Sequence, residues 1–130
     1  MQNKYAADTM ALILYLEQRK LPKEVIKILS EVENGNIELI IPSMVIAELA
    51  YLAERNRIDT NLNEVKVLLR NFKNVKIEPL SFYVIEAAFQ IKNIPELHDR
   101  LIAATASIFN APLITNDPLI KASGLVKVIW

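Results

Sequence analysis

The sequence predicts an α/β protein with a parallel sheet that is covered by helices on both faces. Short apolar segments with strand character alternate with longer segments whose apolar residues recur at helical spacing. Several helical segments start at an aspartate or a proline, which are common at helix N-termini. The 130 residues are 52% hydrophobic, which is enough to bury a core in a single domain spanning residues 1–130.

The first half of the chain predicts two strands and three helices. Residues 4–7 form a short buried strand, and residues 11–18 form an apolar helix. A second helix opens at Pro22 and ends before an Asn-Gly pair that is typical of a helix stop. The β-branched strand 37–41 then leads into a helix over residues 43–55.

The middle of the chain predicts a helix, a strand and another helix. Asn61 and Glu64 have capping-box spacing at the start of a helix over residues 62–72. A short strand over residues 75–77 follows. Ser81 caps the next helix, whose apolar stripe is predicted to lie in the core and consists of Phe82, Ile85 and Phe89.

The last part of the chain predicts a helix that opens at Asp99, a strand over residues 112–116 and a short helix between Asp117 and Gly124. A final strand over residues 126–129 completes the pattern, and the tryptophan after it is expected to cover an edge.

Three aspartates stand where a predicted strand gives way to a helix: Asp8, Asp99 and Asp117. The helix from Asp99 descends about 16 Å and the following strand climbs about 15 Å, so both carboxylates return to the same edge of the sheet. Each aspartate alone is best explained as a helix cap. Three at the same edge favour one charged pocket, at the place where α/β proteins usually bind ligands.

Glu48 lies inside the helix over residues 43–55, on a face formed with apolar and aromatic neighbours. We therefore expect a buried carboxylate, which requires a partner because unpaired buried charge is costly. Side chains of a helix lean toward its N-terminus, so Glu48 can reach the edge that holds Asp8.

An ordered set of short motifs resembles the PIN-domain nucleases, including the VapC-type toxins of toxin–antitoxin pairs. The motifs are Asp8-Thr9, Glu48 in PSMVIAELAYL, Asp99 in HDRLIAATA and Thr115-Asn116-Asp117 in APLITNDPLI. The resemblance spans nearly the whole chain and implies a three-layer α/β/α sandwich with about five parallel strands. One position departs from it, because Met10 stands where many members carry Asn or Ser.

The resemblance and the acids together predict a metal-dependent endoribonuclease, the toxin of such a pair. Asp8, Glu48, Asp99 and Asp117 are the predicted catalytic residues and ligands of Mg²⁺ or Mn²⁺, hard cations that prefer oxygen ligands. The chain has no cysteine and one histidine, which excludes thiolate chemistry and histidine clusters. Thr115 and Thr9 are predicted to hold these ligands in position without binding the metal themselves.

Fifteen basic and fifteen acidic residues give the chain no net charge, so any attraction for RNA must come from local groups of basic residues. The candidate phosphate contacts are Arg100, Arg55, Arg57 and Lys121. The resemblance further implies an antitoxin partner and a homodimer. We also expect a cytoplasmic protein with no membrane attachment, because the sequence has neither a signal-peptide pattern nor a long apolar run.

Two alternatives remain open at this stage. The chain can be a PIN-like interaction module in RNA processing with weak or no catalysis, and Met10 is the feature that favours it. It can also be a phosphoacceptor domain with an aspartate after its first strand, but the segment after Asp8 lacks the acidic pair that such domains need.

Overall fold

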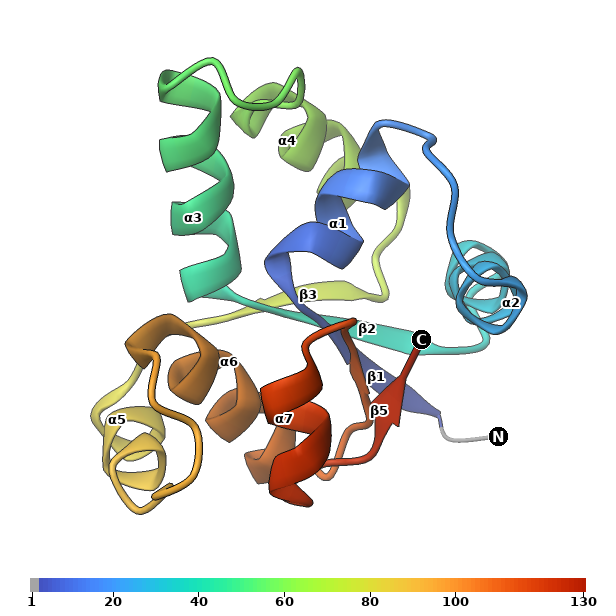
Figure 1. The fold of residues 1–130 in the computed structure, drawn as a ribbon. Helices are drawn as coiled ribbons and strands as arrows, with labels where there is room; N and C mark the ends of the chain where they lie inside the picture. The colour runs from blue at the N-terminus through green and yellow to red at the C-terminus, as the bar shows by residue number, and fades with distance from the viewer. Residues whose placement is uncertain (1–2) are drawn as a thin grey trace.

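A computed structural model describes residues 3–130 and contains a five-stranded parallel sheet with helices on both faces (Figure 1). The strands are β1 (Lys4–Ala7), β2 (Glu38–Pro42), β3 (Val75–Glu78), β4 (Leu113–Ile114) and β5 (Val128–Ile129). They stand in the order β3-β2-β1-β4-β5, and every neighbouring pair is parallel. The predicted α/β fold is confirmed.

The order of the strands determines which helices cover which face. The chain moves from β1 through β2 to β3 and then returns to the other side of β1, so right-handed crossovers place the two sets of helices on opposite faces (Figure 1). One face carries α1 (Thr9–Leu16), α2 (Lys23–Glu33), α3 (Ser43–Glu54) and α4 (Leu62–Asn71). The other carries α5 (Phe82–Ala88), α6 (Leu97–Ile108) and α7 (Pro118–Ser123). The order reverses between β1 and β4, and ligands of open α/β sheets bind at such a reversal.

The core lies on both sides of the central strands. In β2, Leu39, Ile40 and Ile41 are all at most 1% exposed, because a strand covered on both faces alternates between two apolar layers. Each such side chain contributes about 1.5–3 kcal/mol through burial. On α6, the residues from Leu101 to Ala106 are all buried, and four of them are alanine or threonine, which lets the helix approach the sheet closely.

The longest helices of the protein have the ordinary length of helices in globular proteins. Both α3 and α6 have 12 residues, which corresponds to about 18 Å. Across residues 3–130, no helix combines the length and the apolar character needed to cross a membrane.

The last two strands are shorter than predicted. Residues 112–116 and 126–129 were expected to be extended, but β4 and β5 hold only two residues each. Their ladder has two registered pairs, Leu113 with Val128 and Ile114 with Ile129. The sheet ends at β5, so no further strand extends the pairing, and β4 is followed at once by the polar turn that opens α7.

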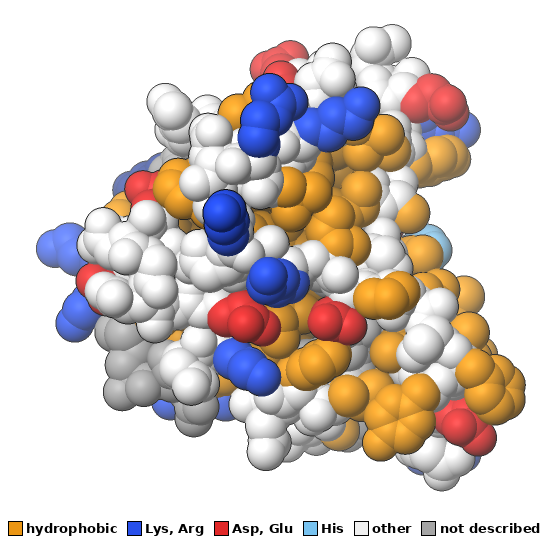
Figure 2. All heavy atoms as spheres, turned by 180° about the vertical axis from the view of Figure 1, so that it is seen from behind, with side chains coloured by type: hydrophobic (Ala, Val, Ile, Leu, Met, Phe, Trp, Pro, Cys, Tyr) orange, Lys and Arg blue, Asp and Glu red, His pale blue; other side chains and the backbone are white. Residues whose placement is uncertain are grey.

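The predicted burial of the α5 stripe is wrong. Phe82 is 74% exposed and Phe89 is 53% exposed, and Ile85 also reaches the surface. Helix α5 packs against α6 through Val84 and Ala88, on its opposite side. Seen from behind, the α5 region carries a group of aromatic and aliphatic side chains on the surface (Figure 2, lower right).

Candidate active site

Asp8 stands directly after β1 and caps α1. Its backbone N–H donates to the carbonyl of Ile114 at 3.1 Å, which fastens this residue to β4. Its carboxylate accepts a hydrogen bond from the N–H of Ala11 at 2.9 Å and another from the hydroxyl of Thr115. Burial raises the pKa of Asp8, and the hydrogen bonds from Thr115 and Ala11 oppose that rise while the charges of Asp117 and Glu48 add to it.

Thr115 and Asp117 follow β4 and face Asp8 across the reversal of the strand order. Asp117 caps α7, where one carboxylate oxygen accepts from the N–H groups of Leu119 at 2.8 Å and Ile120 at 3.2 Å. Thr115 is fully buried, and its hydroxyl accepts from the N–H of Asp117 at 3.1 Å while it donates to Asp8. One threonine therefore fixes both aspartates relative to each other.

Asp99 does not open α6 as predicted. The helix begins at Leu97, and its cap is Glu96, whose carboxylate accepts from the N–H groups of His98 at 3.1 Å and Asp99 at 3.0 Å. Asp99 occupies the first turn, which leaves its own side chain free of the cap. The reason is that Glu96 reaches the helix N–H groups from one position before the helix, although glutamate is not among the favoured caps.

The pKa of Asp99 rises to about 7. Burial is the largest cause, followed by the negative charges of Asp117 and Glu96, a hydrogen bond with the Asp117 carboxyl group, and the charge of Glu48. Asp99 is therefore a carboxyl group held among like charges.

Glu48 reaches toward the same edge from α3. The hydroxyl of Thr9 donates to one of its oxygens at 2.5 Å, and Nδ1 of His98 lies 3.4 Å from the other. Its side chain is 28% exposed and the neighbouring Tyr51 is 56% exposed, so the predicted buried face is only partly buried. Helix α3 contacts α1, α4 and α6, and its side that carries Tyr51 remains at the surface.

The structure thus gathers Asp8, Glu48, Asp99 and Asp117 from four different helices into one electrostatically connected group. Their donors are all carboxylate oxygens, which suit Mg²⁺ or Mn²⁺. Within residues 3–130, however, no three acidic or histidine side chains stand so that they can hold one ion as they are. The donor set fits a hard cation in its chemistry, and Asp8 and Glu48 each accept a hydrogen bond from a threonine hydroxyl that orients the carboxylate.

The predicted RNA-binding cations lie at different places. Nε of Arg100 donates to the carbonyl of Ile94 and its guanidinium lies 5.7 Å from the ring of Phe89, so it contacts the end of α5 and the connection between α5 and α6. Arg55 ends α3 and stacks on Tyr51 at 4.9 Å.

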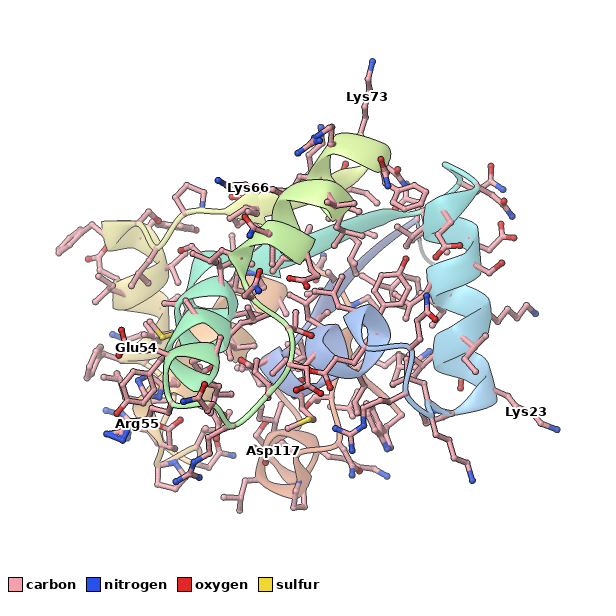
Figure 3. The ribbon with its side chains drawn as sticks, turned by 90° about the horizontal axis from the view of Figure 1, so that it is seen from above. Lys23, Glu54, Arg55, Lys66, Lys73 and Asp117 are labelled. Carbon is pink, nitrogen blue, oxygen red and sulfur yellow. The ribbon has the colours of Figure 1, made fainter. Side chains whose placement is uncertain are left out.

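The other two predicted cations lie at the surface on separate elements. Arg57 is exposed in the connection between α3 and α4, and Lys121 is exposed on α7. Figure 3, which looks down on the molecule of Figure 1, labels Arg55 at the end of α3 and Asp117 at the start of α7, both toward the lower side of the view.

Two residues of this region were not recognised from the sequence. Glu96 adds a fifth negative charge beside Asp99, and His98 was considered a cap-region residue but has Nδ1 within 3.2 Å of Glu96 and 3.4 Å of Glu48. The signal that was available is the acidic residue two positions before the histidine, in the segment PELHD.

Comparison of the sequence with models of protein families identifies the family of this chain. The model of the PIN domain matches residues 5–122. The chain belongs to the PIN-domain family. PIN domains are nucleases, and the acids that carried the resemblance, from Asp8 to Asp117, all lie within the matched residues.

Several solved structures similar to this PIN domain are complexes of bacterial proteins. A chain of VapBC2 from Rickettsia felis bound to promoter DNA is 20% identical, with a TM-score of 0.73 and 98% of each chain covered. DNA-bound VapBC from Salmonella typhimurium is 17% identical, with a TM-score of 0.70 and 98% of each chain covered. A toxin–antitoxin complex from Klebsiella pneumoniae is 19% identical, with a TM-score of 0.65, and the match covers 97% of this chain and 96% of that one. At these identities the likeness establishes the shared fold. No curated protein matches the chain in sequence.

Proposed function

We propose that this PIN domain is a metal-dependent endoribonuclease and the toxin of a toxin–antitoxin pair. The observation that carries the proposal is the gathering of four acids at the reversal of the strand order, with the pKa values of Asp8 and Asp99 raised by burial and then by like charges. Such a group is stabilised by a divalent cation, and metal-assisted hydrolysis of a phosphodiester needs no histidine or cysteine nucleophile.

The residues have separate tasks in this mechanism. Asp8, Glu48, Asp99 and Asp117 would hold Mg²⁺ or Mn²⁺ through their oxygens. A bound ion neutralises charge on the phosphodiester and lowers the pKa of a water. Thr115 orients Asp8 through its hydroxyl. One of the carboxylates accepts the proton that the attacking water loses.

RNA is the proposed substrate. With no net charge on the chain, phosphate attraction depends on individual basic residues, for which the exposed Arg55, Arg57 and Lys121 and the partly buried Arg100 are the candidates. An RNA substrate agrees with a cytoplasmic location, which stays a prediction.

Cleavage assays test the proposal. Labelled RNAs with single-stranded and hairpin regions are incubated with the parent protein and with Glu48→Gln, in Mn²⁺, in Mg²⁺ and in chelator. We expect cleavage with metal, none in chelator, and a strong loss in Glu48→Gln, which retains an oxygen for Thr9 but loses its charge. Cleavage that persists undiminished in chelator would contradict the metal mechanism.

A second candidate is an interaction module with the same fold and little or no catalysis. It is favoured by Met10, which is 49% exposed in the first turn of α1, and by the lack of three preassembled ligands among residues 3–130. Failure of every RNA to be cleaved in either metal, by folded protein, would favour this candidate.

A protein antitoxin is the proposed partner, supported by the similar structures, which are VapBC and toxin–antitoxin complexes. The chain offers a groove of about 570 Å³ between α1, α2 and α4 that is lined largely by apolar side chains. Ile26 and Val67 in this groove are about half exposed, so both can contact a partner that occupies it.

A homodimer is proposed on the exposed stripe of α5, formed by Phe82, Ile85 and Phe89. A row of large apolar side chains at helical spacing on the surface is typical of an interface. Light scattering over a range of concentrations should give a dimer for the parent and a monomer for Phe82→Glu. A strict monomer of the parent at every concentration contradicts the dimer.

A further inference from the structure

A pocket of about 310 Å³ adjoins the acids at the carboxyl ends of β4 and β5. Its lining includes Asn116 and Asp117 after β4, Lys121 on α7, and Val128 and Trp130 at and after β5. Asp117 belongs to both the pocket and the acidic group, so the two sites share a wall. In Figure 3, Asp117 lies at the start of α7, where this wall is formed.

The lining combines a flat aromatic surface with polar groups. Trp130 is 36% exposed, and Pro118 and Val128 add apolar surface to the lining. Asn116 is exposed and has an amide that both donates and accepts hydrogen bonds, and the exposed Lys121 supplies a positive charge. The volume lies at the lower end of the range of ligand pockets, about 300–1,000 Å³, which suits a group the size of a single nucleotide.

A nucleobase matches these features better than a phosphate or an aliphatic side chain does. Its faces stack on aromatic rings, and its edge carries donors and acceptors that an amide can pair with. Phosphate alone is disfavoured here because Asp117 contributes negative charge to the same wall.

We propose that this pocket binds one nucleobase of a single-stranded RNA, stacked on Trp130, with Asn116 contacting the base edge and Lys121 the adjoining phosphate. This inference rests on the proposed function, because the strand that enters the pocket is the one whose backbone crosses the acids. It adds a base-binding subsite that does not need the metal. The acids determine where the strand is cut, and the pocket determines which nucleotide is held beside the cut.

The single tryptophan of the sequence makes the pocket directly observable. Oligoribonucleotides with 2′-O-methyl groups, six residues long and made of one base each, are titrated into the parent protein in chelator. We expect saturable quenching of tryptophan fluorescence, with affinities that differ among the four bases. Absence of quenching by all four overturns the proposal.

Variants separate stacking from general RNA binding. Measured by anisotropy of labelled oligonucleotide, Trp130→Ala should weaken binding about 5- to 150-fold, the range for loss of one base–aromatic stack, and Trp130→Phe should retain most of it. Asn116→Ala should reduce the differences among the four bases. The matched control is Tyr83→Ala, an aromatic residue on α5 that is 67% exposed, and it should bind as the parent does.

The outcomes also separate this inference from the nuclease proposal. Trp130→Ala that binds like the parent, or a Tyr83→Ala loss of equal size, overturns the base pocket even if metal-dependent cleavage is found. Saturable binding that depends on Trp130, in a protein that cleaves no RNA, supports the pocket and contradicts the nuclease. A melting temperature for each variant shows whether the fold is kept, and Trp130→Phe and Asn116→Ala decide the matter if Trp130→Ala does not fold.

Discussion

Helix α1 carries an acid at each end, and the two acids have opposite properties. Asp8 caps its start and Glu17 follows its end. The helix dipole alone would favour the negative charge of Asp8 at the start and disfavour that of Glu17 at the end. The pKa of Asp8 is nevertheless raised and that of Glu17 is lowered.

The surroundings of the two carboxylates explain the reversal. Burial opposes the ionisation of Glu17, but its oxygen accepts from the hydroxyl of Thr60 at 2.9 Å and from the N–H groups of Thr60 and Asp59 at 3.1 Å, and Arg19 lies 3.7 Å away. Asp8 also accepts two hydrogen bonds, but it is buried beside further acids. Glu17 has its donors within the protein and fastens the connection between α3 and α4. Within residues 3–130, no lysine or arginine forms an ion pair with the acids around Asp8, which is typical of a binding site and not of a structural carboxylate such as Glu17.

The largest expected effect is on the rate of RNA cleavage, which should fall when Asp8 at the start of α1 is changed but not when Glu17 at its end is changed. Asp8→Asn keeps the helix cap, because asparagine caps as well as aspartate, but it loses the charge. Its RNA cleavage rate should fall at least about 100-fold, since even residues behind metal ligands affect affinity or activity 10- to 100-fold.

Glu17→Gln is the matched control for Asp8→Asn. It should cleave RNA at the parent rate and lose about 1 kcal/mol of unfolding free energy, because the amide oxygen accepts from the same donors but without the negative charge that strengthens these hydrogen bonds. Equal cleavage rates in the two variants would remove the distinction between the ends of α1.

A smaller effect is expected at Thr115, which links Asp8 and Asp117 without being a ligand. Thr115→Val keeps the shape of the side chain and removes both hydrogen bonds, so Mn²⁺ affinity should fall about 10- to 100-fold. Thr105→Val is the control, because Thr105 is equally buried but its hydroxyl donates only to the Leu101 carbonyl within α6. Calorimetric titration with Mn²⁺ measures both, and an equal change in the two variants would show a packing effect instead.

A further effect concerns pH and Asp99. In the folded state its pKa is about 7, against 3.8 in the unfolded chain, so between these values the folded state holds a proton that the unfolded state has released. The free energy of unfolding of the metal-free protein should therefore fall as the pH rises from about 4 to about 7. Urea unfolding over this range should show a smaller decline for Asp99→Asn, and an identical decline in both proteins contradicts the raised pKa.

Periodicity predicted the elements of the fold better than it predicted their surroundings. Asp8 and Asp117 were placed correctly, because an aspartate after a short apolar strand is a local signal. The stripe of α5 was misassigned because spacing shows that Phe82 and Phe89 share a face but not whether that face meets the core or a partner. The start of α6 was misplaced because glutamate is an unusual cap, although Glu96 fulfils that role here.

Contacts between distant segments were beyond sequence reasoning. Glu17 contacts residues more than 40 positions away, and nothing local distinguishes it from an exposed glutamate. The same holds for the short ladder of β4 and β5, whose length depends on where the sheet ends. The gathering of the acids was predictable because it follows from the geometry of parallel strands, but their role as ligands stays a prediction.

Titration calorimetry with Mn²⁺ at pH 8 tests most directly whether the acidic edge is a metal site. At this pH Asp99 is ionised, because its pKa is about 7. We expect saturable binding that chelator reverses for the parent and for Glu17→Gln, and at least about tenfold weaker binding for Asp99→Asn. No saturable binding to the folded parent, or the same affinity in Asp99→Asn, would contradict the assignment of this edge as a metal site.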